Sequence, residues 1–146
     1  MAGESLKIVY YFDPYLKLCP LERYFASLEP TENSAEHIAR RQWKLLADLD
    51  NKIKVVAAGG GRPLMPIAMP LKSYPLIEIR QRKSRDVLIR ILFFSYRDLM
   101  VLLSGFEKPD QYKGSRIKEE IKKEFELARQ YRNNFIADQK LYEEYK

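Results

Sequence analysis

The order of the expected elements predicts an α+β fold: an antiparallel sheet, formed by an N-terminal strand and a three-strand meander, packed with two N-terminal helices and one long C-terminal helix. Three patterns predict it: a β-branched and aromatic run opens the chain, three similar runs follow closely in the second half, and a long amphipathic stretch comes last. With 146 residues, the chain has room for one domain, 1–146. Hydrophobic residues are 46% and charged residues 32%, as expected of a folded domain.

The first expected strand is the run Leu6–Phe12, which ends at the turn pair Asp13-Pro14. Pro20 suits the first turn of a helix, because the N–H that proline lacks is not needed there. This first helix is expected to end before Pro30. Its apolar residues at helical spacing are Leu21, Tyr24, Phe25 and Leu28.

A second, longer helix is expected to begin at Asn33 or Ser34, because Glu36 lies three residues after Asn33 and the pair resembles a capping box. Its apolar stripe consists of Ile38, Ala39, Leu45, Leu46 and Leu49. Three glycines at 59–61 and four prolines at 63–75 then predict a long flexible loop. This loop lacks the Lys-Ser/Thr ending of a phosphate-binding P-loop.

Three consecutive strands are expected at Leu76–Lys83, Asp86–Arg97 and Leu99–Lys108, with short polar breaks that predict an antiparallel meander. After Gly114 and Ser115, an apolar stripe predicts the longest helix. The stripe consists of Ile117, Ile121, Phe125, Ala128, Tyr131 and Phe135. Residues 139–146 are expected to extend this helix or to fray.

The charge is moderately basic and unevenly distributed. The net charge is +6, and residues 76–123 carry 12 lysines and arginines against 7 acids. An excess of this kind favours a phosphate-rich or acidic partner. We therefore look for a binding site on the meander.

Strand alternation places Glu78, Arg80 and Arg82 on the face opposite to the neighbouring isoleucines. Arg90 is the only charge inside a long apolar run, and a buried charge must pair or bind a ligand. Two interpretations of Arg90 stay open: a structural bridge to Glu78, or phosphate binding. If the strands are neighbours, Arg80, Arg90 and Lys108 converge on one anion site.

Other chemistries have weaker support. His37, the sole histidine, lies far from the basic strands, and its pattern favours a surface or packing role over catalysis. Cys19 is the sole cysteine, so no disulfide or cysteine-based zinc site is expected within the chain, and we expect it to cap or pack a helix. No membrane-spanning run and no signal peptide is recognised, so we expect a cytoplasmic protein. We also expect no metal and no cofactor.

Several short motifs resemble one family when taken in order. They are Leu76-Ile-Glu-Ile-Arg80, then Leu88-Ile-Arg90-Ile-Leu-Phe-Phe94, then Val101-Leu-Leu-Ser-Gly-Phe106-Glu-Lys108, followed by the basic helix Lys113–Arg132. This pattern resembles the RelE/ParE superfamily of bacterial toxins, specifically its HigB-like, phage-derived branch. The run Cys19–Leu28 is similar to the first helix of that family.

The resemblance implies the toxin of a type II toxin–antitoxin system, an endoribonuclease that cuts mRNA at the ribosome and is paired with a helix-turn-helix antitoxin. In the reaction it implies, the RNA 2′-hydroxyl attacks the adjacent phosphate. Arg80 and Arg90 would hold that phosphate, Lys108 would assist as a cation or proton-transfer group, and Tyr112 is a further catalytic candidate. The residues expected to bind RNA around them are Arg82, Lys83, Arg97 and Lys113.

Three alternatives remain. A non-catalytic, phage-derived module would use the same basic face to hold RNA or an acidic protein. A gyrase-directed toxin is a related variant, which the HigB-like residues of the motifs disfavour. A purely structural domain would pair Arg80 and Arg90 with acids. Pro109 stands where many members of the family have a second lysine, which keeps the non-catalytic alternative in view.

Overall fold

The computed structural model describes residues 4–109 and 114–145. Their helices and strands confirm the predicted α+β class, with three helices and a six-stranded sheet in the described part of the chain. In chain order the elements are β1 (Lys7–Tyr11), α1 (Pro20–Leu28), α2 (Glu36–Ala58), β2 (Ala68–Pro70), β3 (Ile77–Arg82), β4 (Val87–Tyr96), β5 (Leu99–Pro109), α3 (Ser115–Ala137) and β6 (Tyr142–Glu144).

The sheet has the strand order β2-β3-β4-β5-β1-β6. The predicted meander forms its centre, with β3, β4 and β5 paired antiparallel in sequence order. β1 runs parallel to β5, so the sheet is mixed rather than wholly antiparallel. The two helices between β1 and the meander provide the long connection that a parallel neighbour requires.

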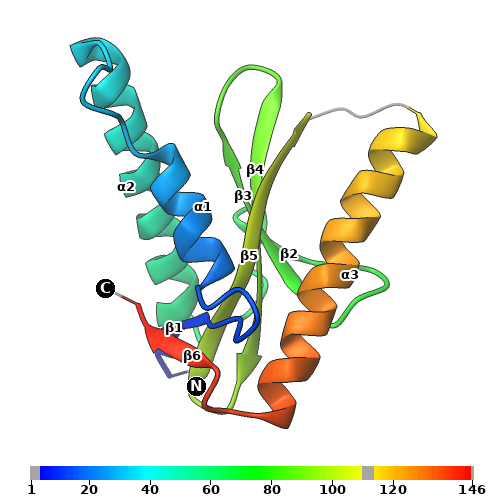
Figure 1. Ribbon diagram of the computed structural model, residues 1–146. Helices are drawn as coiled ribbons and strands as arrows, with labels where there is room; N and C mark the ends of the chain where they lie inside the picture. Colours follow the sequence, from blue (N-terminus) through cyan, green and yellow to red (C-terminus); the bar gives the residue numbers. More distant parts are fainter. Residues whose placement is uncertain (1–3, 110–113, 146) are drawn as a thin grey trace.

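Helices cover both faces of the sheet (Figure 1), with α1 and α2 on one face and α3 on the other. Ile79, Ile89 and Ile91 belong to the core under α1 and α2. Leu92 and Phe106 belong to the core under α3. Alternate residues of each strand therefore serve different cores, as the pleat requires.

Close approach of α1 to the sheet explains one glycine. A Cβ at Gly105 would lie 2.7 Å from Leu21 Cδ1 and 2.9 Å from Tyr24 Cδ2. A larger residue at this position of β5 would therefore push α1 away from the strand.

Three expectations about element boundaries are wrong. α2 begins at Glu36, and its N-cap Ala35 has no side-chain hydrogen bond, so no capping box forms. Ser34 Oγ instead accepts a hydrogen bond from the Thr31 N–H in the preceding turn. The loop after the glycines contains the edge strand β2, and the segment after α3 forms β6 against β1 rather than extending the helix.

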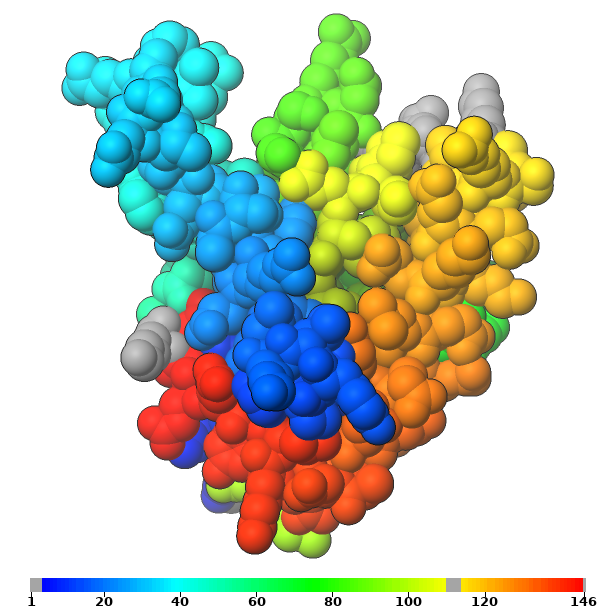
Figure 2. All heavy atoms as spheres, viewed as in Figure 1, coloured from blue at the N-terminus to red at the C-terminus, as the bar shows by residue number. Residues whose placement is uncertain are grey.

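The helices diverge at one end of the molecule. Figure 2 shows the β3–β4 hairpin projecting there, with a gap between it and the N-terminal end of α2. α3 also begins at this end (Figure 1). The described residues thus leave both faces of the hairpin end less covered than the rest of the sheet.

Candidate active site

Three predicted cations lie on the α3 face of the central strands. Arg80 of β3 is directly opposite Arg90 of β4. On β5, Phe106 is opposite Arg90, and Lys108 is opposite Leu88, two residues from Arg90. Because directly opposed residues point to the same face, the register places all three cations on one surface.

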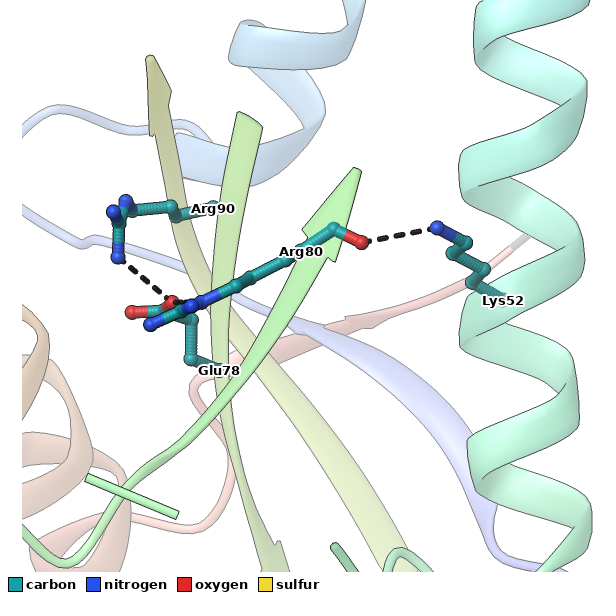
Figure 3. A network of polar contacts seen from close by, with 4 residues as sticks. All are labelled: Lys52, Glu78, Arg80 and Arg90. Atoms are coloured by element: carbon teal, nitrogen blue, oxygen red, sulfur yellow. Dashed lines mark hydrogen bonds and ion pairs between the residues drawn. The ribbon is translucent and has the colours of Figure 1, made fainter. Parts of the chain in front are cut away.

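Glu78 joins the two arginines (Figure 3). Its Oε1 accepts a hydrogen bond from Arg90 Nη1 at 2.9 Å and one from Arg80 Nε at 2.5 Å. The Glu78 and Arg90 side chains are only 1% and 3% exposed, whereas Arg80 is 38% exposed. The Arg90–Glu78 bridge considered from the sequence is therefore present. Arg80 is the arginine of this pair that an incoming anion can reach.

The backbone of Arg80 is anchored from the opposite face. Lys52 of α2 donates a hydrogen bond from Nζ to the Arg80 carbonyl oxygen at 3.1 Å (Figure 3). Burial lowers the pKa of Lys52, an effect that nearby Asp48 opposes. This contact ties the end of β3 to α2 and fixes the strand that carries Arg80.

Lys108 faces two glutamates of α3. Its Nζ lies 3.0 Å from Glu120 Oε2, and this pair lowers the pKa of the Glu120 carboxyl. Glu124 lies one turn further along α3. Partial burial raises its pKa, and the charge of Lys108 opposes that rise. A carboxyl whose pKa is raised binds a proton more readily than an exposed glutamate does.

Glu120 and Glu124 are functional candidates that sequence reasoning missed, since an acid among exposed lysines is usually a solvated residue. The available clue was their spacing, because Glu120 and Glu124 flank Ile121 on the stripe that turns toward the sheet.

Lys83 lies apart from the three cations. It forms ion pairs with Glu107 at 2.9 and 3.0 Å, and Glu107 also accepts a hydrogen bond from Tyr24 of α1. Burial, reinforced by Glu107, raises the pKa of Tyr24. Lys83 therefore belongs to the face that α1 and α2 cover.

The other predicted RNA-binding residues are scattered. Arg82 donates a hydrogen bond to the Arg85 carbonyl in the β3–β4 hairpin, close to Arg80. Arg97 lies in the turn at the far end of β4 and covers the Tyr96 ring. It lies seven residue steps from Arg90, or about 23 Å at 3.3 Å per step along a strand. Tyr112 and Lys113 lie outside the described residues.

Cys19 occupies the N-cap position of α1, but its side chain makes no capping hydrogen bond, and the residue packs in the core at only 2% exposure. Burial and the neighbouring Glu143 and Glu22 raise its pKa to about 12. These three residues are the one group of potential metal ligands within residues 4–109 and 114–145. His37 is exposed on α2, away from the cations.

Comparisons with protein-family models, curated proteins and solved structures find no match for this chain. Among the described residues, no helix combines the length and apolar character needed to cross a membrane.

Proposed function

We propose that the protein is an endoribonuclease that cuts mRNA at the ribosome, the toxin of a type II toxin–antitoxin pair in the cytoplasm with a helix-turn-helix antitoxin as partner. One observation carries the proposal: cations from three adjacent strands share one face of a rigid sheet. Arg80 and Lys108 reach solvent there with side chains that are 38% and 22% exposed. Such a surface suits a phosphodiester.

In the proposed reaction the RNA supplies its own nucleophile. The 2′-oxygen forms a bond to the adjacent phosphorus, the bond from phosphorus to the 5′-oxygen breaks, and the products end in a 2′,3′-cyclic phosphate and a 5′-hydroxyl. Arg80 binds the phosphate oxygens and stabilises the charge that develops on them. Each such donor contributes about 10²–10³ in rate in other enzymes.

Arg90 acts as a positioning residue. Arg90 is buried, lies opposite Phe106 on the sheet and pairs with Glu78. It holds the Glu78 carboxylate in place, and this carboxylate in turn orients the Arg80 guanidinium. A guanidinium oriented in advance loses less conformational freedom when it binds a phosphate.

Two proton transfers accompany the reaction. The Glu124 carboxylate, with its pKa raised by burial, takes the proton of the 2′-hydroxyl. Lys108, which the register places on the same face, donates a proton to the leaving 5′-oxygen. Lys108 must leave Glu120 to do so, and the 46% exposure of Glu120 lets water solvate the released carboxylate.

A second function has specific support. Arg80, Arg90 and Lys108 each have an acid partner within the molecule, as expected if the face is structural or only holds a partner. A non-catalytic module of this kind would bind RNA or an acidic protein in a salt-sensitive way without cleaving the message.

Expression of the protein in bacterial cells tests the proposal. The wild type should arrest growth, and Arg80→Ala should relieve the arrest because the phosphate loses its main cation. The variant should still fold, because Glu78 retains its ion pair with Arg90. Arg40→Ala, which removes an exposed arginine of α2 paired with Glu36, should arrest growth as the wild type does. Full arrest by Arg80→Ala would contradict the proposed site.

A further inference from the structure

A hollow lies between α3 and the loop that leads into β3. Its lining consists of Ser73, Tyr74, Lys118, Ile121, Lys122 and Phe125. The Tyr74 and Phe125 rings meet edge to face, with centroids 5.4 Å apart. Figure 1 shows this loop, which follows β2, passing beside α3. The hollow therefore has an aromatic wall and an open, basic rim.

The two lysines of the rim have no counter-ion in the described parts of the chain. Lys118 and Lys122 are one turn apart on α3 and both are exposed. Like charges at this spacing destabilise a helix. Glu126, the acid one turn after Lys122, is engaged instead by Arg129 and by the Tyr74 hydroxyl. The lysine pair is thus available to an external anion.

The hollow adjoins the proposed active site. Phe125 contacts Phe106 with ring centroids 6.2 Å apart, and Phe106 is opposite Arg90 on the sheet. Tyr74 precedes Arg80 by six residues, which span at most about 20 Å of chain. A short RNA strand bound at Arg80 can therefore place a neighbouring nucleotide in the hollow.

We propose that this hollow is a nucleotide subsite for single-stranded RNA, in which a base stacks on Tyr74 with its edge against Phe125 while Lys118 and Lys122 bind its phosphate. The inference rests on the proposed function, because it assumes that RNA lies across the same face. Stacking on an aromatic ring is a main source of affinity for single-stranded nucleic acid. The subsite would favour one base at a fixed distance from the cleaved bond.

The test measures binding of four 2′-O-methyl homohexamers, of A, C, G and U, which cannot be cleaved by 2′-oxygen attack. The wild type should prefer one of them by at least fivefold. Lys118→Gln with Lys122→Gln should weaken binding of all four about tenfold. The slope of log affinity against log salt concentration should become shallower by about 0.7, the value for one phosphate contact. The control pair Lys123→Gln with Lys140→Gln removes the same charge outside the hollow and should change affinity less than twofold.

Substitutions of Tyr74 test the stacking step. Tyr74→Ala should abolish the preference among the four oligonucleotides, whereas Tyr74→Phe keeps the ring and should preserve it. The subsite proposal would be overturned if the Lys118/Lys122 and Lys123/Lys140 double variants lost equal affinity for RNA. It would also be overturned if Tyr74→Ala kept the wild-type preference among the four oligonucleotides.

These results separate the subsite from the nuclease. If Arg80→Ala abolishes cleavage while the subsite variants bind and select RNA like the wild type, the subsite is wrong and the nuclease stands. If the subsite variants lose binding as expected but the wild type cleaves no RNA, the subsite stands and the nuclease is wrong.

Discussion

Glu78 determines how the candidate site is built. Its carboxylate is almost completely buried and accepts hydrogen bonds from two guanidinium groups, so its charge is compensated locally. A buried charge that loses its partner is strongly destabilising, whereas an exposed arginine contributes little to stability. Arg80 and Arg90 share one acid but should therefore respond differently to substitution.

Arg90→Ala should lower the free energy of unfolding by about 3 kcal/mol, because Glu78 remains buried with part of its partner set removed. Urea denaturation monitored by circular dichroism measures this loss. The same experiment on Arg40→Ala, at an exposed position, should show a change within about 0.5 kcal/mol. An unchanged midpoint for Arg90→Ala would mean that the buried bridge contributes nothing. A loss of toxicity in Arg90→Ala reports folding as well as function, so Arg80→Ala is the cleaner test of the site.

Glu124→Gln should make the protein more stable at pH 7. Burial raises the pKa of Glu124 in the folded protein, so ionising this carboxyl costs stability as the pH rises above the ordinary glutamate value of 4.5. Glutamine carries no such cost, and its advantage should disappear when the pH falls below 4. Thermal unfolding at pH 7 and pH 3.5 measures the difference, with Glu119→Gln as the exposed control on the same helix. An equal gain at both pH values would contradict the assignment.

For single residues of the candidate site, the sequence was informative only where side chains alternate between the two faces of a strand. Alternation identified the face shared by Glu78, Arg80 and Arg82, and the isolated charge in an apolar run identified Arg90. Alternation also places Lys83 on the opposite face, although its neighbourhood in sequence suggested a common site. The role of Glu124 depends on which side of α3 packs on β5, which no local pattern contains.

Among the elements, α2 is packed unevenly. Its buried residues are Leu49, Ile53, Val56 and Ala57, all in the C-terminal half, and residues 36–48 include none. A helix without tertiary packing is marginal in water. Amides of residues 40–45 should therefore exchange with solvent faster than those of residues 50–56.

Ala35→Ser should slow this exchange. Ala35 is the N-cap of α2 and offers no side-chain acceptor, so serine adds a missing hydrogen bond. An N-cap gain of about 0.7 kcal/mol corresponds to roughly threefold slower exchange in the first turns. Hydrogen–deuterium exchange with residue resolution measures the effect. If the amide exchange rates of the first turns and of the rest of α2 stayed unchanged, the missing N-cap hydrogen bond would not limit the stability of this end of the helix.

β6 forms the edge of the sheet next to β1, opposite to the edge formed by β2. Tyr145 follows it, packs on the Tyr10 ring at 5.1 Å and donates a hydrogen bond to Asp50 of α2. Burial, reinforced by Asp50, raises the pKa of this phenol. The C-terminal strand thus links β1 to α2.

Tyr145→Ala should cost about 3 kcal/mol of stability, as expected for loss of a packed aromatic ring. Tyr145→Phe keeps the ring and should lose about 1 kcal/mol, the net contribution of one hydrogen bond. Chemical denaturation of both variants measures the two losses. If Tyr145→Ala were as stable as the wild type, the C-terminal strand would not belong to the cooperative fold.

Long periodic elements were predictable from the sequence, and the two short edge strands were not. The meander and α3 contain enough residues for a pattern to repeat, and their observed bounds lie within one or two residues of those expected. β2 and β6 have three residues each, and they are strands because a partner edge is available in space. The parallel orientation of β1 likewise follows from packing rather than from its own residues.

On the scale of the whole molecule, the sheet separates two kinds of surface. One face carries α1 and α2, which anchor the strands, and the other carries α3 (Figure 1). The register places Arg80, Arg90 and Lys108 on the α3 face. The proposed active site and the proposed subsite both belong to the second face and share the contact between Phe106 and Phe125. A single RNA strand can engage both without any rearrangement of the sheet.

Direct detection of RNA ends tests the central claim. A translated mRNA incubated with the purified protein should acquire 2′,3′-cyclic phosphate ends, and Arg80→Ala should lower their rate of formation about 100-fold or more while keeping a wild-type melting curve. Arg40→Ala should cut at the wild-type rate. Absence of such ends with the wild-type protein, or their undiminished formation by Arg80→Ala, would contradict the account.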